Sequence, residues 1–299
     1  MTGTPTLCAL LLFSLTVAAC GKKPEGIIAS GAGVEKLADG FSFTEGPIAD
    51  KKGNVYFTDQ PNDRILLWSV DGALSTFLEE SGRANGLYFD RDGRLLSCSD
   101  MDNQLWSIGM DGSHTVLVDG FDDKKINGPN DVWVSPQGGI YFTDPLYVRD
   151  YWTRDPKTQT DGENVYYLSP DRKTLTIADG DLVKPNGIVG TPDGKHIYVA
   201  DIQARKTYIY DILSDGSLAN KRLFANSGSD GMTIDNRGNI YMTGRGVIVF
   251  NPEGEQIENI AIEDTGTTNV CFGGKDGKTL FITAVKYLYG VRMNVKGVR

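Results

Sequence analysis

One short sequence pattern occurs six times along the chain and constrains its fold more than any other feature. Each copy is a glycine followed by a strand of alternating apolar residues that often ends in Asp, as in GNVYFTD and GKHIYVAD. The copies begin at Gly53, Gly93, Gly138, Gly194, Gly238 and Gly277, so the gaps between them are 40, 45, 56, 44 and 39 residues. Strand-rich repeats of about 40 to 50 residues are typical of β-propellers.

Each copy is followed by a second pair of strands around a turn, and several of these turns contain an Asp-Gly hairpin dipeptide, such as Asp71-Gly72. Glycine makes up 36 of the 299 residues and proline only 12, an excess of glycine that suits many tight turns. We therefore predict an all-β fold, a six-bladed β-propeller with four-stranded antiparallel blades, over residues 37–299. The third gap is longer than the others because of an insertion at residues 146–165.

The amino terminus carries an export signal. Residues 7–19 are nearly all apolar, but a run this short cannot span a bilayer, which needs about 20 residues. Cys20 follows two alanines and precedes a polar stretch, and this arrangement resembles a bacterial lipoprotein signal. We therefore predict a signal peptide at 1–19, a lipid on Cys20 and a flexible tether at 20–36. The alternative is an ordinary secretory signal with a chance cysteine.

On either interpretation the mature chain leaves the cytoplasm, as a periplasmic lipoprotein of the cell envelope or as a secreted protein. Its membrane contact is then the lipid anchor alone. The formal net charge of −9 repels phosphate backbones, so we expect no nucleic-acid partner. His114 and His196 are the two histidines, which disfavours a Ser-His-Asp triad or a multi-histidine metal site. Cys98 and Cys271 are expected to pack within strands as thiols.

A polar residue stands eight positions before each repeat glycine. These six residues, called the ring residues below, are Glu45, Asn85, Asn130, Asn186, Asp230 and Asn269. Equivalent positions of a propeller lie around its axis, so their side chains should meet at one mouth of the channel. Six buried polar groups without partners would be costly, and a hard divalent cation is the natural partner for their oxygens. The alternative is that Asn-Gly and Asp-Gly are ordinary turn dipeptides that a repeat protein duplicates.

At these residues the chain resembles the gluconolactonase and regucalcin-like family. The resemblance is carried in order by FTEGPIADKKGNVYFTD, ANGLYFDRDGRLL, INGPNDVWVSPQGGIYFTDP, KPNGIVGTPDGKHIYVAD and SDGMTIDNRGNIYM, over most of residues 40–285. It implies one divalent cation in the channel, Ca²⁺ first, with Mg²⁺, Mn²⁺ or Zn²⁺ as alternatives. It also implies that the ligands are Glu45, Asn130, Asn186 and Asp230.

The resemblance further implies a hydrolase that opens small sugar lactones, with Asp230 as both metal ligand and general base. Asn130 would also orient substrate hydroxyls, and Asn85 and Asn269 would line the same mouth. Asp131 is expected to bond strand backbone in preference to orienting the site.

One departure concerns substrate choice. Regucalcin-type members have an arginine where this chain has Gly128, so Arg83 and Tyr147 are further candidates for contacting the substrate. The insertion at 146–165 either covers the channel as an aromatic lid or packs on its blade. The remaining alternatives are a lactonase or esterase acting on another substrate, and a non-catalytic propeller that binds ligands at the cell envelope. No protein partner is implied.

Overall fold

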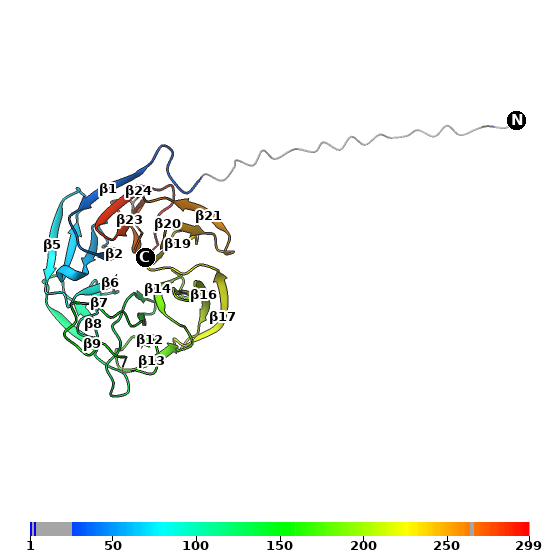
Figure 1. Cartoon of the computed structure of the whole chain (residues 1–299). Coiled ribbons are helices and arrows are strands. Elements are labelled where there is room, and N and C mark those ends of the chain that lie inside the picture. Colours follow the sequence, from blue (N-terminus) through cyan, green and yellow to red (C-terminus); the bar gives the residue numbers. More distant parts are fainter. Residues whose placement is uncertain (2, 4–25, 159, 264–265, 299) are drawn as a thin grey trace.

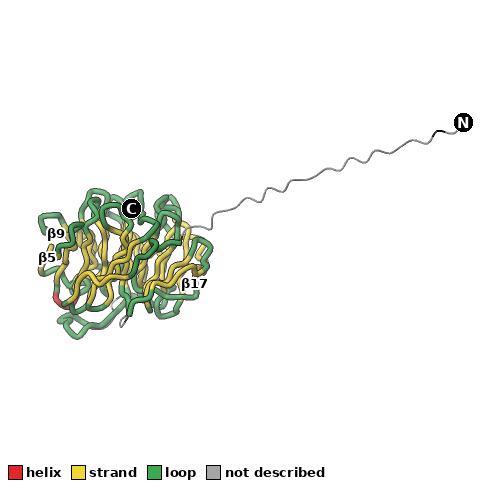
Figure 2. The backbone as a smooth tube through the Cα atoms, turned by 90° about the horizontal axis from the view of Figure 1, so that it is seen from above, coloured by secondary structure: helices red, strands yellow, loops and turns green. Residues whose placement is uncertain are grey.

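The computed structural model describes residues 26–158, 160–263 and 266–298, together with Met1 and Gly3. In it, six four-stranded antiparallel sheets surround a central axis, which confirms the predicted six-bladed propeller (Figure 1). The side view shows the strands between two faces covered by turns and loops (Figure 2). The expected signal peptide and the lipidation site Cys20 fall almost wholly in residues 4–25, outside the described part of the chain.

The first three blades follow one another along the chain, each running from its innermost to its outermost strand. Their strands are β2 (Thr44–Ala49), β3 (Val55–Asp59), β4 (Arg64–Trp68) and β5 (Leu74–Glu79); β6 (Ala84–Phe89), β7 (Leu95–Ser99), β8 (Gln104–Ile108) and β9 (His114–Val118); and β10 (Val132–Val134), β11 (Ile140–Asp144), β12 (Asn164–Leu168) and β13 (Leu175–Asp179). The short 3-10 helix η1 (Gln60–Asn62) follows β3.

Blades four and five repeat this order, and blade six takes its outermost strand from the start of the chain. Their strands are β14 (Pro185–Gly190), β15 (His196–Asp201), β16 (Lys206–Ile212) and β17 (Leu218–Ala225); β18 (Met232–Ile234), β19 (Ile240–Gly244), β20 (Gly246–Phe250) and β21 (Gln256–Ile260); and β22 (Asn269–Gly273), β23 (Thr279–Ala284), β24 (Tyr287–Arg292) and β1 (Val34–Asp39).

Pairing of β1 with β24 closes the propeller, because it joins the two ends of the described chain in one sheet (Figure 1). The preceding residues also lie on blade six: Ile28 forms a β-bridge with Met293, and Ile27 is buried among its apolar side chains. Residues 26–36, expected to belong to a tether, are therefore part of the propeller. Backbone hydrogen bonds from Ala29 to Arg292 and from Asn294 to Ile27 also hold this segment on blade six.

All six repeat glycines lie at the turn between the first and second strands of a blade, and all have positive φ, between 68° at Gly277 and 95° at Gly138. The amide of each donates to the carbonyl three residues earlier, as Gly53 does to Asp50 at 3.0 Å. Residues other than glycine rarely adopt this left-handed conformation. The repeat thus marks one face of the propeller, called the turn face below. The ring residues lie at the other ends of the same strands, on the ring face.

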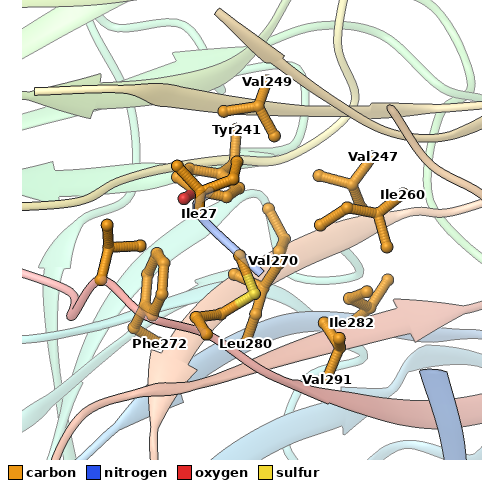
Figure 3. Packing of buried hydrophobic residues seen from close by; sticks show 12 residues of the cluster. Ile27, Tyr241, Val247, Val249, Ile260, Val270, Phe272, Leu280, Ile282 and Val291 are labelled. Carbon is orange, nitrogen blue, oxygen red and sulfur yellow. The ribbon is translucent and has the colours of Figure 1, made fainter. Parts of the chain in front are cut away.

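The hydrophobic core is divided among the six junctions between adjacent blades. In the junction of blades five and six, Val249 of β20, Val270 of β22 and Leu280 of β23 belong to one buried cluster (Figure 3). Five similar clusters join the other neighbouring blades. Burial of apolar surface is the main force that stabilises a fold, so the blades are held to one another by the same alternating residues that define the repeat.

Two smaller expectations concern cysteines and membrane contact. Cys98 in β7 and Cys271 in β22 are buried thiols of different blades, as predicted. Within the described residues, no helix has the length and apolarity needed to cross a bilayer.

Two of the aspartates at the ends of second strands bond loop backbone of their own blade. Asp59 accepts the amides of Ser42 and Phe43, and Asp201 those of Val183 and Lys184. In these two blades the bonds fix the chain that leads into the innermost strand, and therefore the start of the strand where the ring residue lies.

Candidate active site on the ring face

The six ring residues stand at the starts of the innermost strands or just before them, and neighbouring innermost strands contact one another around the axis. Five of the ring residues are buried, with exposures of 2% for Glu45 and 3% for Asn85, and no more than 6% for the others. Asp230 differs because it keeps partial contact with solvent. The repeat therefore places a closed ring of carboxylates and amides at one mouth of the channel.

Glu45 and Asp230, from blades one and five, lie close enough for each to shift the pKa of the other. Burial raises the pKa of Glu45 well above its usual value, and the charge of Asp230 adds to that rise. Burial also raises the pKa of Asp230, while hydrogen bonds with Asn186 and Glu45 and the charge of Arg149 oppose the rise. Two like charges in a space that excludes water repel each other, so both carboxylates favour a bound positive charge.

Asp131 lies beside this pair and adds a third carboxyl group. Its Oδ1 accepts the amide of Val132 at 3.0 Å, which confirms the expected bond to strand backbone. Burial raises the pKa of Asp131 to about 8, and the charge of Asp230 contributes to the rise. Asn269 lies beside both Asp131 and Glu45 and opposes the rise in the pKa of each. The acidic group at the mouth is thus larger than the repeat pattern predicts.

The donor set fits a divalent cation with oxygen ligands. The side-chain oxygens of Asn85 and Asn186 are buried and have no hydrogen-bond partner, which is costly unless something else satisfies them. In the described part of the chain, no ion pair involves Glu45, Asp131 or Asp230, and no three His, Cys, Asp or Glu side chains are arranged as a metal site. Amide oxygens must therefore complete any coordination by the two carboxylates, and Ca²⁺ accepts such mixed ligands.

A cavity on the ring face borders Asp230. This cavity of about 370 Å³ lies on the ring face between blades four and five, and its lining includes Asp230, Ser227, Thr243, Thr267 and Arg205. A second cavity of about 820 Å³ occupies the rest of the channel and opens on the turn face. Only the first borders the partly exposed carboxylate.

The long insertion between β11 and β12 reaches the ring. Tyr147 lies near its start, and the Nδ2 of Asn186 donates to the Tyr147 hydroxyl at 3.0 Å. The Lys184 Nζ lies 4.6 Å from the centroid of the Tyr147 ring, and the guanidinium carbon of Arg149 lies 5.2 Å from the same centroid. Tyr147 is therefore the predicted substrate contact that the structure brings to the mouth.

The rest of the insertion is anchored on blades two and three. Asp100, at the end of β7, accepts the indole N–H of Trp152 at 3.0 Å and pairs with Arg154 at 3.4 Å. Arg154 also donates to the carbonyl of Asn127 at 2.6 Å. The insertion therefore packs on the blades, which is one of the two alternatives. It also places Tyr147 at the mouth, as the other alternative, an aromatic lid over the channel, requires.

Arg83 is engaged with the insertion and not with the ring. Its guanidinium lies 4.2 Å from the centroid of the Tyr151 ring and also donates to the carbonyl of Pro61. Among its described contacts none is to a ring residue. Its predicted role in binding substrate receives no support from this placement.

The position of Gly128 also depends on the insertion. A Cβ atom there would lie 2.5 Å from a carboxylate oxygen of Asp100 and 2.8 Å from a guanidinium nitrogen of Arg154. The Asp100–Arg154 pair fills this space, so no side chain fits. Asp100, Arg149 and Arg154 were missed by sequence reasoning, because nothing in the repeat indicates which blade the insertion contacts.

The fold and the site together define a six-bladed propeller with a carboxylate and amide ring at one channel mouth. The chain belongs to the SMP-30/Gluconolactonase/LRE-like family, whose conserved region matches residues 43–286. The chain is therefore a member of a lactonase family of hydrolases.

Three known proteins illustrate the similarity. The gluconolactonase of Zymomonas mobilis is 29% identical over 294 residues, which cover 88% of this chain and 82% of that protein. A solved gluconolactonase from Xanthomonas campestris superposes with a TM-score of 0.83 at 27% identity, covering 89% of this chain and 91% of that one. A calcium-binding regucalcin from Agrobacterium tumefaciens superposes with a TM-score of 0.74 at 20% identity, covering 88% of this chain and 94% of that one. At this identity the similarity shows the fold alone.

Proposed function

We propose that this protein is a metal-dependent hydrolase that opens small sugar lactones at the ring face. The observation that carries the proposal is the meeting of Glu45 and Asp230 beside two unsatisfied amide oxygens, where Asp230 borders an open cavity. The similarity to gluconolactonases supports the choice of a sugar lactone as substrate.

Glu45, Asn130, Asn186 and Asp230 would hold one divalent cation. Their donors are all oxygens, which suits Ca²⁺ best, while Mg²⁺, Mn²⁺ and Zn²⁺ remain alternatives. A divalent cation at this place supplies a Lewis acid for the ester carbonyl and lowers the pKa of water. The calcium-binding regucalcins of the family support calcium as the first choice.

The protein's own residues would then divide the remaining tasks. Asp230 accepts the proton of the attacking water, because it is the ring carboxylate that keeps contact with solvent. Water adds its oxygen to the carbonyl carbon, the ring C–O bond breaks, and the ring oxygen takes a proton, which yields one hydroxy acid. Asn85, Asn130, Asn269 and Tyr147 would orient the substrate hydroxyls.

The test is a lactone assay on the purified mature protein, with glucono-δ-lactone as the first substrate. We expect opening that chelator abolishes and added Ca²⁺ restores. Asp230→Asn should lower kcat by about 10²- to 10⁴-fold, the usual range for a general base. Asp71→Asn, which removes an exposed carboxylate, is the matched control and should leave kcat unchanged. Turnover that survives both chelation and Asp230→Asn contradicts the proposal.

A broader lactone and ester panel distinguishes the alternatives. If another lactone is turned over in a metal-dependent way and glucono-δ-lactone is not, the proposed site stands and the proposed substrate is wrong. Metal binding without turnover of any panel member would favour the ligand-binding propeller.

We also propose that the chain is a lipoprotein of the cell envelope, with cleavage before Cys20 and lipid on its thiol. The apolar run at 7–19 and its small residues before Cys20 support this. Cys20→Ser should abolish incorporation of labelled palmitate and release the protein from membranes, while Cys8→Ser should change neither. Membrane association that persists in Cys20→Ser would contradict the anchor.

A further inference from the structure

Arg149 places a positive charge beside the mouth that forms no ion pair within the described residues. Its side chain forms no hydrogen bond and no ion pair within the described residues, and its Nε is buried without a partner. The residue as a whole is half-buried. An arginine normally satisfies its five donors with water, carboxylates or carbonyls, so a buried unsatisfied nitrogen is costly.

Two neighbouring cations of this region, Lys184 and Arg154, are each paired with a carboxylate. Lys184 pairs with Glu163 at 3.1 Å and donates to the carbonyl of Leu146 at 2.9 Å. Arg154 pairs with Asp100, whose second oxygen accepts the Trp152 indole. Glu163 and Asp100 are therefore occupied by these cations. Arg149 forms no ion pair of its own within the described residues, although its charge acts on Asp100 and Asp230.

The place of Arg149 directs this charge to the site. Its guanidinium carbon lies 5.2 Å from the Tyr147 ring centroid, and the Tyr147 hydroxyl touches Asn186 in the ring. Its charge also acts on Asp230, whose pKa it lowers. The guanidinium thus lies between the anchored insertion and the ring face, on the side where a ligand of the mouth would lie.

We propose that Arg149 is a substrate-binding residue that holds the carboxylate formed when the lactone ring opens, so that the ligand class of this subsite is a hydroxy-carboxylate. The inference rests on the proposed function and names a contact that the ring residues do not provide. In the reaction the lactone and one water become a hydroxy-carboxylate and a proton, so negative charge appears on the former carbonyl.

The chemistry of the residue suits this ligand. The guanidinium is planar and presents parallel N–H groups that match the two oxygens of a carboxylate. A ligand carboxylate would satisfy the donors that the protein leaves open and offset the cost of the half-buried charge. The guanidinium also lies over the Tyr147 ring, which is a cation–π contact.

The test measures both product binding and turnover in the full mature chain with Ca²⁺ present. Sodium gluconate is the probe, and its affinity is taken from calorimetry and from its inhibition of lactone opening. We expect Arg149→Gln to weaken gluconate binding about 10- to 100-fold, the usual loss for a charged hydrogen bond. The KM for lactone should rise less, because the lactone carries no charge. Addition of guanidinium chloride to Arg149→Ala should restore part of the binding.

Arg91→Gln is the matched control, because Arg91 is an exposed arginine on the turn face, at the opposite mouth of the channel. It should leave gluconate binding unchanged, which separates a direct contact from a change in net charge. Equal gluconate affinity in Arg149→Gln and wild type overturns the inference, even when lactone turnover is present. If wild type opens no lactone, the calorimetry alone decides, so failure of the proposed function remains distinguishable.

Discussion

Replacing Asp100 by alanine should release the insertion from the propeller without unfolding the blades. Asp100 is 4% exposed and joins blade two to the insertion through Trp152 and Arg154. The other second-strand aspartates described above bond backbone of their own blade, so Asp100 alone among them holds a distant segment. Its loss removes contacts of the insertion and leaves the strand pairing of blade two unchanged.

The size of the effect follows from the burial of the pair. The Arg154 side chain is 13% exposed and that of Asp100 is 6% exposed, and removing one partner of a buried ion pair costs about 3 to 5 kcal/mol. The insertion can avoid this cost by moving away so that Arg154 meets water. A cost of about 3 kcal/mol therefore shifts the docking equilibrium by about 100-fold or more toward the undocked state.

Limited trypsin digestion measures this equilibrium, because the insertion contains cleavage sites after Arg149 and Arg154. Cleavage there should be faster by a similar factor in Asp100→Ala, since cleavage requires the open state. The double variant Asp100→Ala/Arg154→Met also removes the Arg154 charge that Asp100→Ala leaves without its partner. Cleavage after Arg149, the arginine that remains in the insertion, should therefore be slower in the double variant than in Asp100→Ala. An unchanged cleavage rate in Asp100→Ala would refute the anchoring role.

Three further outcomes follow from the described geometry. Gly128→Ala should also release the insertion, because its Cβ would meet both members of that ion pair and its φ is 147°; an unchanged trypsin pattern would contradict this. Cys98 and Cys271 should react with thiol reagents only after unfolding, because both are buried and burial raises the pKa of Cys98 well above its usual value; peptide mapping of native protein tests this. The pKa of Asp131 is raised to about 8, so its contribution to stability is complete below its unfolded pKa of about 4 and is lost as pH rises through 8. In chelator, Tm should therefore fall between pH 5 and pH 8, and excess Ca²⁺ should remove the fall; a Tm that rises in chelator would count against it.

The repeat pattern predicted the blades because it records a backbone requirement. Gly53 and Gly277 stand at turns of positive φ, which few residues other than glycine adopt. The glycines therefore recur at the same place in each blade and can be recognised in the sequence. Closure by β1 was not predictable in the same way. No repeat glycine precedes Ile27 and Ile28, and their contact with blade six depends on the complete ring of blades.

The ring was predictable for a related reason, since equal distances from equal turns place equivalent residues at one height along the axis. Asp131 was harder to assign, because its neighbours come from three other blades. Arg149 and Asp100 could not be assigned at all. They meet through the insertion, whose path over the ring face is set by contacts with blades two, three and four and not by any period of the sequence.

The two parts of the site therefore have different origins in the chain. The ring residues stand at the same place in every blade, and a symmetric ring can grip an ion on the axis but favours no direction for a substrate. The insertion occupies one side of the ring face, with Tyr147 against Asn186, and the cavity beside Asp230 lies in the junction of blades four and five. A ligand at the mouth then has the acidic ring below it and the charge of Arg149 beside it. In the proposed function, the repeat would hold the ion, and the insertion that interrupts the repeat would select the substrate.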